Sequence, residues 1–351
     1  MLKFNLSVLV FLIFFSSCSK NQYDLSNYSL PEICDGKCEP ASDINSFYDA
    51  VLNSSALFSN CICLGEGVFD GLITVAKPLV LVGRNDGLSY LKNLVISNSY
   101  YVKLKDFSFK SIDSGSGVLY ILGSSVEMEN ILVSDISASS ISGGRGIIIS
   151  GEESDVKIKN SKIEKTAGTG LLINGNHTVS LENVTISDCG FTGIWVQNHN
   201  QKKGNLSISN SKILNSAAAG IEILGNSSLK LLNSKIEKIQ KRDFMLESVG
   251  DGIVIKNSIL SNPNSLIIEN SEIGGFSRAG IILDGEDENL EIKSVFKDLK
   301  IFSDNGSFGI VVQNGFETSG FRNGVIHNDF ASVDDEYDGE LFIMDNFVEL
   351  Q

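Results

Sequence analysis

The sequence has little proline, histidine and tryptophan. Of 351 residues, 4 are proline, 3 are histidine and 1 is tryptophan, whereas 33 are glycine. Many glycines with few prolines favour a chain that turns often and pairs its backbone densely. No Ser-His-Asp order with a supporting elbow motif is present. His177 and His199 follow similar segments and would suit a two-histidine metal site, but we interpret them as polar turn residues and expect no metal centre.

Positive charge is also scarce. Lysine and arginine together number 28 against 43 aspartates and glutamates, which gives a formal net charge of −15. This balance argues against a nucleic-acid partner and against electrostatic attachment to anionic lipid. It disfavours a strongly acidic polysaccharide unless calcium or a local basic patch intervenes. The hydrophobic fraction of 42% is sufficient for a large core.

No hydrophobic run is long enough to span a membrane comfortably, but the start of the chain is typical of an export signal. Lys3 precedes an almost wholly apolar stretch, residues 4–15, and small residues follow it. Residues 15–18 resemble a bacterial lipobox, in which Cys18 would carry the lipid, and Ser19 resembles an outer-membrane sorting residue. We expect a signal peptide at residues 1–17 and a lipid-anchored protein at the outer membrane or cell surface. The alternative is an ordinary signal peptide cut nearby.

Four cysteines of the exported part form two close groups, Cys34 with Cys38 and Cys61 with Cys63. Because disulfides persist outside the cytoplasm, we expect two of them to join the N-terminal segment to the first strand. Their connectivity does not follow from the sequence. Zinc is the alternative, although the spacing is poor and no histidine is near. Cys189 remains as a small buried side chain.

The middle of the chain repeats two short patterns. A glycine followed by an apolar residue recurs eight times between residues 117 and 309, at a mean step of about 27 residues and a shortest step of 23. Between these glycines, apolar residues alternate up to an asparagine, at Asn130, Asn160, Asn183, Asn210, Asn233 and Asn270. Such self-similarity indicates a solenoid.

The apolar spacing of two indicates strands, only three to five residues long. Three strands per repeat would give coils whose strands stack in parallel at about 4.8 Å. The asparagines would then share one corner, where their amides can stack as a ladder.

These patterns resemble the coil repeats of right-handed parallel β-helix proteins of the pectin-lyase-like group, over residues 61–315. The resemblance implies an all-β solenoid of about nine to eleven coils. It does not fix the activity, because that fold carries lyases, hydrolases, esterases, epimerases, adhesins and inert scaffolds.

The open ends of such a solenoid need covers. We expect residues 18–41 to be a tether and residues 42–60 an N-terminal cap. Within the cap, Ser42 would cap a helix whose apolar stripe is Ile44, Phe47, Tyr48, Val51 and Leu52. Residues 316–351 lose the repeat and are acidic, which indicates a C-terminal cap. A solvated charge run is expected there, with calcium as the alternative.

The β-helix enzymes that the chain resembles use external carboxylates, often with calcium, and a basic side chain. Their signatures, paired aspartates or a His-Gly pair, are absent here. The best substitutes are Asp251 and Arg278, expected on adjacent coils near one corner, with Glu222 and Asp284 close by. With calcium as the one plausible cofactor, such a group would abstract a proton α to a uronic carboxylate. It could equally be an ion pair at the surface.

Two outward-facing columns are expected beside the repeated glycines. The column two residues after each glycine is mostly apolar, namely Leu119, Ile148, Leu172, Trp195, Glu222, Val254, Ile282 and Val311. The column four residues after is mostly polar and includes Asn174 and Gln197. An exposed apolar stripe is unusual. A glycan stacked on Trp195 and hydrogen-bonded to Asn174 and Gln197 would explain it, as would a protein partner or cover by the chain's own segments.

We therefore expect a non-catalytic surface lipoprotein that binds carbohydrate or protein. The alternative is a polysaccharide lyase or glycoside hydrolase that uses Asp251 and Arg278, and a third hypothesis is a passive spacer or adhesin.

Overall fold

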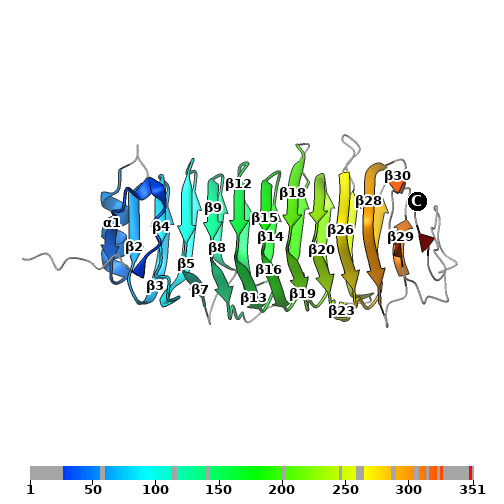
Figure 1. The fold of residues 1–351 in the computed structure, drawn as a ribbon, viewed down its shortest axis with the longest axis horizontal. Coiled ribbons are helices and arrows are strands. Elements are labelled where there is room, and N and C mark those ends of the chain that lie inside the picture. Colours follow the sequence, from blue (N-terminus) through cyan, green and yellow to red (C-terminus); the bar gives the residue numbers. More distant parts are fainter. Residues whose placement is uncertain are drawn as a thin grey trace, which may run out of the picture.

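The strands stack into a single right-handed β-helix of about nine turns (Figure 1). The computed structural model describes residues 27–55, 60–111, 117–138, 143–199, 202–244, 247–257, 265–285, 290–303, 308–313, 316–321, 325–326 and 348–349. Cys18 and the predicted signal peptide lie outside them. Within these residues no helix is long and apolar enough to cross a membrane.

Each turn contributes strands to three parallel sheets. Sheet 1, whose outer face carries the predicted site, contains the second halves of β3 (Gly67–Val75) and β5 (Ser89–Ser97), then β8 (Gly117–Leu122), β11 (Arg145–Ser150), β14 (Leu171–Asn174), β17 (Ile194–Asn198), β20 (Ala219–Gly225), β25 (Asp251–Asn257), β27 (Ala279–Gly285) and β29 (Phe308–Gln313).

Sheet 2 follows sheet 1 along each turn. It contains β1 (Glu39–Ala41), β2 (Asn60–Leu64), β4 (Leu79–Val82), β6 (Val102–Lys105), β9 (Ser125–Glu129), β12 (Asp155–Lys159), β15 (Thr178–Glu182), β18 (Gly204–Ser209), β21 (Ser227–Leu232), the first halves of β26 (Ser265–Gly274) and β28 (Leu290–Phe302), and β30 (Phe316–Phe321).

Sheet 3 closes the turn. It contains the first halves of β3 and β5, then β7 (Ser108–Lys110), β10 (Leu132–Ser134), β13 (Lys162–Thr166), β16 (Thr185–Cys189), β19 (Lys212–Leu214), β22 (Lys235–Glu237), the second halves of β26 and β28, and β31 (Val325–Ile326).

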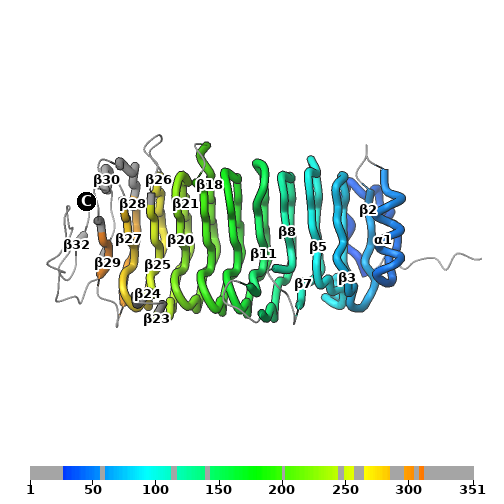
Figure 2. The backbone as a smooth tube through the Cα atoms, turned by 180° about the vertical axis from the view of Figure 1, so that it is seen from behind, coloured from blue at the N-terminus to red at the C-terminus, as the bar shows by residue number. Residues whose placement is uncertain are grey.

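Two antiparallel pairings depart from this plan. β23 (Arg242–Phe244) and β24 (Glu247–Val249) form a hairpin between β22 and β25, and β32 (Val348–Glu349) pairs with β31. The tube view from behind shows the same regular stack, with the hairpin at its lower edge (Figure 2).

The residue after each repeated glycine forms an inward column. Ile147, Leu171, Ile194, Ile221 and Ile253 lie in register on consecutive strands, and each is at most 1% exposed. Each such burial stabilises the fold by about 1.5–3 kcal/mol. The predicted all-β solenoid is therefore confirmed, and its coil number falls within the predicted range.

The glycines themselves are required by close stacking. A Cβ on Gly193 would lie 2.7 Å from the carbonyl oxygen of Gly220 and 2.7 Å from Cγ2 of Ile213. Neither contact is tolerable, so the turn at this position admits only glycine without a shift of the backbone. The repeated glycines thus allow one turn to approach the next.

The predicted asparagine corner is present. Asn130, Asn160, Asn183, Asn210, Asn233 and Asn270 all adopt left-handed backbone conformations, with φ between 48° and 55°. Asparagine tolerates this region better than most residues because its short side chain can form hydrogen bonds with the nearby backbone. The amides also bond between turns: Nδ2 of Asn183 donates to Oδ1 of Asn160 at 2.8 Å, and Nδ2 of Asn130 donates to Oδ1 of Asp106 at 2.6 Å.

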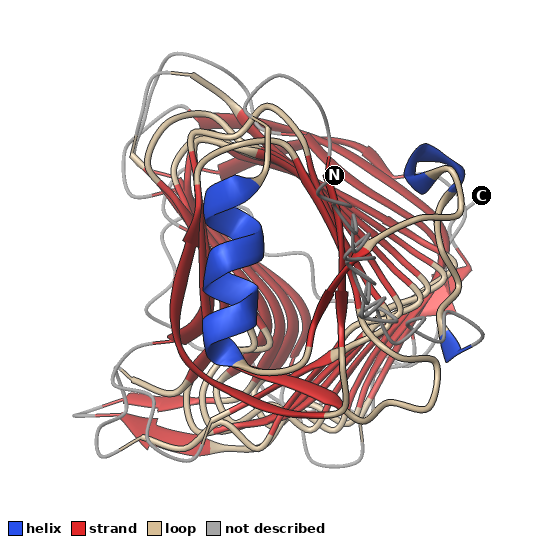
Figure 3. Cartoon of the chain, turned by 90° about the vertical axis from the view of Figure 1, so that its left-hand side faces the viewer, coloured by secondary structure: helices blue, strands red, loops and turns tan. Residues whose placement is uncertain are grey.

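Helix α1 (Ile44–Asn53) lies across the first turn of the solenoid, as the view along the axis shows (Figure 3). Two details differ from prediction. The N-cap is Asp43 rather than Ser42, because the Asp43 carboxylate accepts from the Ser46 N–H at 2.8 Å in a capping box. The buried face is Phe47, Ala50 and Val51, whereas Leu52 is 73% exposed, so the helix is rotated toward Ala50.

Two disulfides fasten the N-terminal segment to β2, as predicted. Cys34 bonds to Cys61 and Cys38 bonds to Cys63, both with Cα atoms 5.7 Å apart. The adjacent strand β1 pairs in parallel with β2. From residue 27 onward the segment expected to be a tether is thus packed onto the solenoid. At the other end, β30 still pairs in parallel with β28, and most of the predicted acidic cap lies outside the described residues.

Candidate functional site

The strand register defines the first outward column of sheet 1, two residues after most of the repeated glycines. Its members are Tyr120, Ile148, Leu172, Trp195, Glu222, Val254, Ile282 and Val311. The prediction of Leu119 was wrong. Gly117 pairs with Arg145 rather than Gly146, so β8 is offset by one residue, Leu119 points inward with 0% exposure and Tyr120 takes its place.

The expectation of an exposed apolar stripe was also wrong. Ile148, Leu172, Val254 and Ile282 are each only 5–6% exposed. Val254 and Ile282 pack with Ala219 and Ala279, and Phe308 and Val311 lie against them. The alternative that the chain covers its own column is therefore correct.

Trp195 contacts the ring of Phe191, which in turn contacts Arg242 from a second loop. The ring of Phe191 meets it edge to face with centroids 5.6 Å apart, and the Arg242 guanidinium lies 5.5 Å from the centre of the Phe191 ring. Arg242 comes from the β23–β24 hairpin and also donates to the carbonyl of Gly190. Trp195 remains half-buried, and its Nε1 is buried without a hydrogen-bond partner among the described residues.

Glu222 lies directly beside Trp195 in the parallel ladder. Burial raises the pKa of its carboxyl group, the nearby Lys256 lowers it, and the charge of Asp251 raises it further. A carboxyl group with a raised pKa can hold a proton nearer neutral pH than an exposed glutamate. Glu222 is therefore a candidate proton donor on the outer face of sheet 1.

Asp251 and Arg278 are joined across neighbouring turns, as their sequence positions suggested. Nε of Arg278 donates to Oδ1 of Asp251 at 2.9 Å and Nη2 donates to Oδ2 at 2.5 Å, and the backbone N–H of Ala279 donates to Oδ1 at 3.2 Å. Asp251 is 1% exposed, while the Arg278 side chain is 35% exposed. A carboxylate so enclosed has no oxygen directed to solvent, which is a poor arrangement for a general base.

The second outward column contains Ser150, Asn174, Gln197, Leu224, Lys256 and Asp284, in register. Asn174 is exposed, Gln197 and Lys256 are half-buried, and Asp284 is 7% exposed. Asn174 and Gln197 face each other on β14 and β17, one column away from Trp195. The outer face of sheet 1 thus carries the amides of Asn174 and Gln197, the indole of Trp195 and the carboxyl group of Glu222 on adjacent strands.

Both ring nitrogens of His177 are taken up by hydrogen bonds. His177 is 1% exposed and fully hydrogen-bonded: Nδ1 accepts from the Ser154 N–H at 3.1 Å and Nε2 donates to the Asn174 carbonyl at 2.9 Å. His199 is exposed. No three acidic, histidine or cysteine side chains of the described residues come together as a metal-ligand set.

The roles of Phe191 and Arg242 could not be predicted, because both lie in segments that do not repeat. An aromatic residue two positions before Gly193 was the one available signal for a contact with Trp195.

Solved structures share the fold at low sequence identity. The tailspike protein gp49 of Acinetobacter baumannii bacteriophage Fri1, a capsular polysaccharide depolymerase, has a TM-score of 0.54 and 11% identity over 82% of this chain. The mannuronan C-5 epimerase AlgE6 A-module of Azotobacter vinelandii has a TM-score of 0.52 and 11% identity, over 82% of this chain and 93% of that one. Pectate lyase Pel9A has a TM-score of 0.43 and 15% identity, over 81% and 80% of the two chains. The chain spans 57% of the tailspike.

Comparison with curated protein sequences found no match. A family model described as the right handed beta helix region matches residues 92–201, 145–265 and 201–347, which together cover most of the chain. The stacked sheets, the inward columns and this match agree, and the chain belongs to the right-handed β-helix family.

Proposed function

We propose that this chain is an exported protein, lipid-anchored through Cys18, that binds a polysaccharide on the wall formed by β14, β17, β20 and β25. The observation that carries the proposal is the placement of Asn174 and Gln197 side by side, next to the column of Trp195 and Glu222. Amide and carboxyl groups hydrogen-bond sugar hydroxyls, and an indole edge offers an apolar contact.

The shape of the wall supports a polymeric ligand. Its four strands lie on consecutive turns spaced at about 4.8 Å, so one surface can contact several sugar units at once. The tailspike and the epimerase carry names that refer to polysaccharides, and they share this elongated architecture. A protein partner is less well supported, because the apolar column that would have favoured it is buried.

The binding role is favoured over catalysis because Asp251 is enclosed by Arg278 and Ala279. One observation favours an enzyme, namely the raised pKa of the Glu222 carboxyl group beside Trp195. In that second hypothesis Glu222 would be the proton donor of a polysaccharide lyase or hydrolase, with calcium as the cofactor that such chemistry often uses.

A glycan array with the wild type and the double variant Asn174→Ala/Gln197→Ala tests the binding wall. Loss of about tenfold or more in affinity is expected for the double variant. Asn205→Ala, an exposed asparagine on sheet 2, is the matched control and should bind like the wild type. Absence of any bound glycan, or unchanged binding by the double variant, would remove the proposal.

A turnover assay separates binder from enzyme. Acidic and neutral polysaccharides with added calcium should show no new reducing ends and no absorbance of unsaturated products. Products that disappear in Glu222→Gln would instead establish the catalytic hypothesis. The lipid anchor is tested separately by mass spectrometry of the exported protein and of Cys18→Ser.

A further inference from the structure

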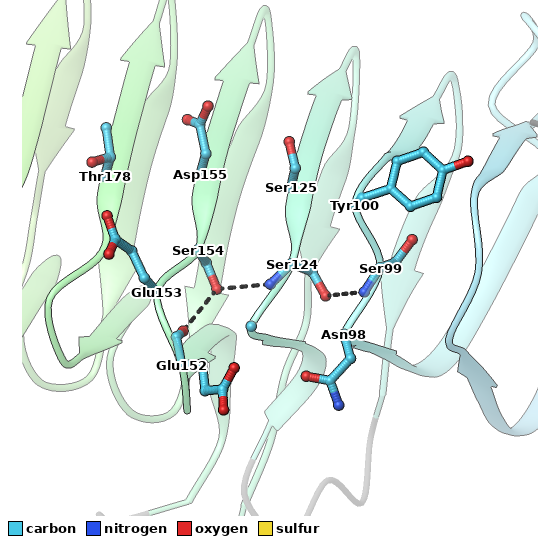
Figure 4. Close-up of a pocket in the computed structure, with 11 residues that line it drawn as sticks. Asn98, Ser99, Tyr100, Ser124, Ser125, Glu152, Glu153, Ser154, Asp155 and Thr178 are labelled. Atoms are coloured by element: carbon cyan, nitrogen blue, oxygen red, sulfur yellow. Dashed lines mark hydrogen bonds between the residues drawn. The ribbon is translucent and has the colours of Figure 1, made fainter.

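A pocket of about 680 Å³ lies at the corner where sheet 1 leads into sheet 2, away from Trp195 (Figure 4). It crosses neighbouring turns of the solenoid. Its lining includes Tyr100, Gly123, Ser125, Glu152, Glu153 and Asp155. None of these residues stood out in the sequence, because the corner segments differ from turn to turn.

A line of buried hydrogen bonds holds the floor of the pocket. The Ser99 N–H donates to Oγ of Ser124 at 3.0 Å, and the Ser124 N–H donates to Oγ of Ser154 at 3.1 Å. The Ser154 N–H in turn donates to Nδ1 of His177. Each of these side chains is at most 3% exposed. The backbone at this corner is therefore fixed before any ligand arrives.

Gly123 keeps the floor open. Its φ of +55° lies in the left-handed region, and an added Cβ would be 3.0 Å from Oδ1 of Asn98 and 3.3 Å from Cβ of Glu152. A side chain at this position would meet Asn98 and Glu152, which both line the pocket (Figure 4). The shape of the pocket thus depends on a glycine in its lining.

The walls of the pocket differ in character. At one end the Tyr100 side chain is 66% exposed, and among the large hydrophobic residues that the structure describes only Leu52 is more exposed. Toward the other end stand Glu152, Glu153 and Asp155, all exposed. Lys202 lies 3.8 Å from Glu153 and Lys157 lies 4.0 Å from Asp155, but the residues that line the pocket include three carboxylates and no basic side chain. The pocket is therefore acidic, and its carboxylates are not grouped as a metal-ligand set.

We propose that this pocket binds a saccharide that carries no acidic group. The C–H face of a sugar ring would stack on Tyr100, and its hydroxyl or amino groups would donate to Glu152, Glu153 and Asp155. The same carboxylates repel a uronate, because like charges at short range raise the cost of binding. The site is separate from the wall at Asn174 and Gln197 and does not require that wall to bind.

Isothermal titration with three oligosaccharides tests the proposal. The probes are a neutral glucan oligomer, a glucosamine oligomer with free amines, and a galacturonate oligomer. We expect the first or second to bind, and Tyr100→Ala to weaken that binding by about tenfold or more, whereas Tyr100→Phe should retain most of it. The galacturonate oligomer should show no heat that depends on Tyr100.

A second variant tests the acidic wall. Glu152→Gln should weaken the glucosamine oligomer more than the neutral one, because it removes a charge and keeps the shape. Glu182→Gln, an exposed glutamate on the outer face of β15, is the control. Thermal melting should give the same midpoint for Tyr100→Ala as for the wild type, since Tyr100 is mostly exposed.

The outcomes separate this site from the wall. Three results would overturn the proposal that the pocket binds a saccharide without an acidic group. They are binding by Tyr100→Ala that equals the wild type, binding of galacturonate that depends on Tyr100, and no binding of either non-acidic oligomer. If Asn174→Ala/Gln197→Ala abolishes glycan binding and Tyr100→Ala does not, the wall stands without the pocket. If Tyr100→Ala abolishes glycan binding and Asn174→Ala/Gln197→Ala does not, the result supports binding in the pocket and contradicts binding on the wall.

Discussion

Arg278 binds the carboxylate of Asp251 from the next turn of the solenoid, and its Nε and Nη2 each donate a hydrogen bond to a different carboxylate oxygen. Because Asp251 is 1% exposed, the removal of Arg278 would leave a buried carboxylate that lacks its counter-ion. We expect Arg278→Ala to lower the free energy of unfolding by about 3 kcal/mol, the lower end of the usual range because the Arg278 side chain is partly exposed. Urea unfolding measures the change.

The control for this variant is Lys235→Ala. Lys235 pairs with Glu272 between neighbouring turns, but both side chains are about a third or more exposed. Such a pair contributes less than about 1 kcal/mol. Equal losses from Arg278→Ala and Lys235→Ala would show that Asp251 is not the enclosed charge described above.

His177 should make the stability depend on pH. Burial lowers the pKa of its imidazole, although its bond to the Asn174 carbonyl and the charge of Glu153 oppose this. The unfolded chain then binds a proton more readily, so stability is complete above the unfolded pKa of about 6.5 and is lost as the pH falls below it. Protonated His177 could no longer accept from the Ser154 N–H.

Urea unfolding at several pH values between about 7.5 and about 5 checks this dependence. His177→Asn should flatten the curve relative to the wild type, whereas His199→Asn, at an exposed position, should not. If both variants follow the wild type, the titrating group lies elsewhere.

The disulfide between Cys34 and Cys61 should stabilise the N-terminal end. It joins residues 27 apart, and a loop of this size taken alone corresponds to about 3.5 kcal/mol in the chain-entropy model. We expect Cys34→Ser/Cys61→Ser to lower the midpoint of thermal unfolding and to increase hydrogen exchange in α1 and β2. Unchanged exchange there would contradict a stabilising role.

Cys189 should be inert in the folded protein. Its side chain is 2% exposed and burial raises the pKa of the thiol to about 11, so almost no thiolate is present or accessible at neutral pH. Under non-reducing conditions, one thiol that is silent in the native state should react with a thiol reagent on unfolding. Cys189→Ser should lack it. Rapid labelling of the native protein at this cysteine would refute its burial.

The repeating parts of this protein could be predicted from the amino-acid sequence. Alternating apolar residues set the short strands, the repeated glycines allow close approach, and the asparagines occupy the left-handed corner at Asn160 and Asn183. The same pattern brings Asp251 to Arg278, because stacked turns make residues one period apart into neighbours. The presence of a helical cap also follows from local periodicity.

Features that depend on segments outside the repeat could be seen only in the folded chain. Phe191 packs on Trp195 and Arg242 on Phe191, the one-residue offset of β8 turns Leu119 inward, and the corner around Gly123 opens a pocket. The partners of Cys34 and Cys38 likewise depend on how the first turn closes. The period of the sequence repeat determines which way a side chain points. Its exposure depends instead on loops of variable length that extend from other turns.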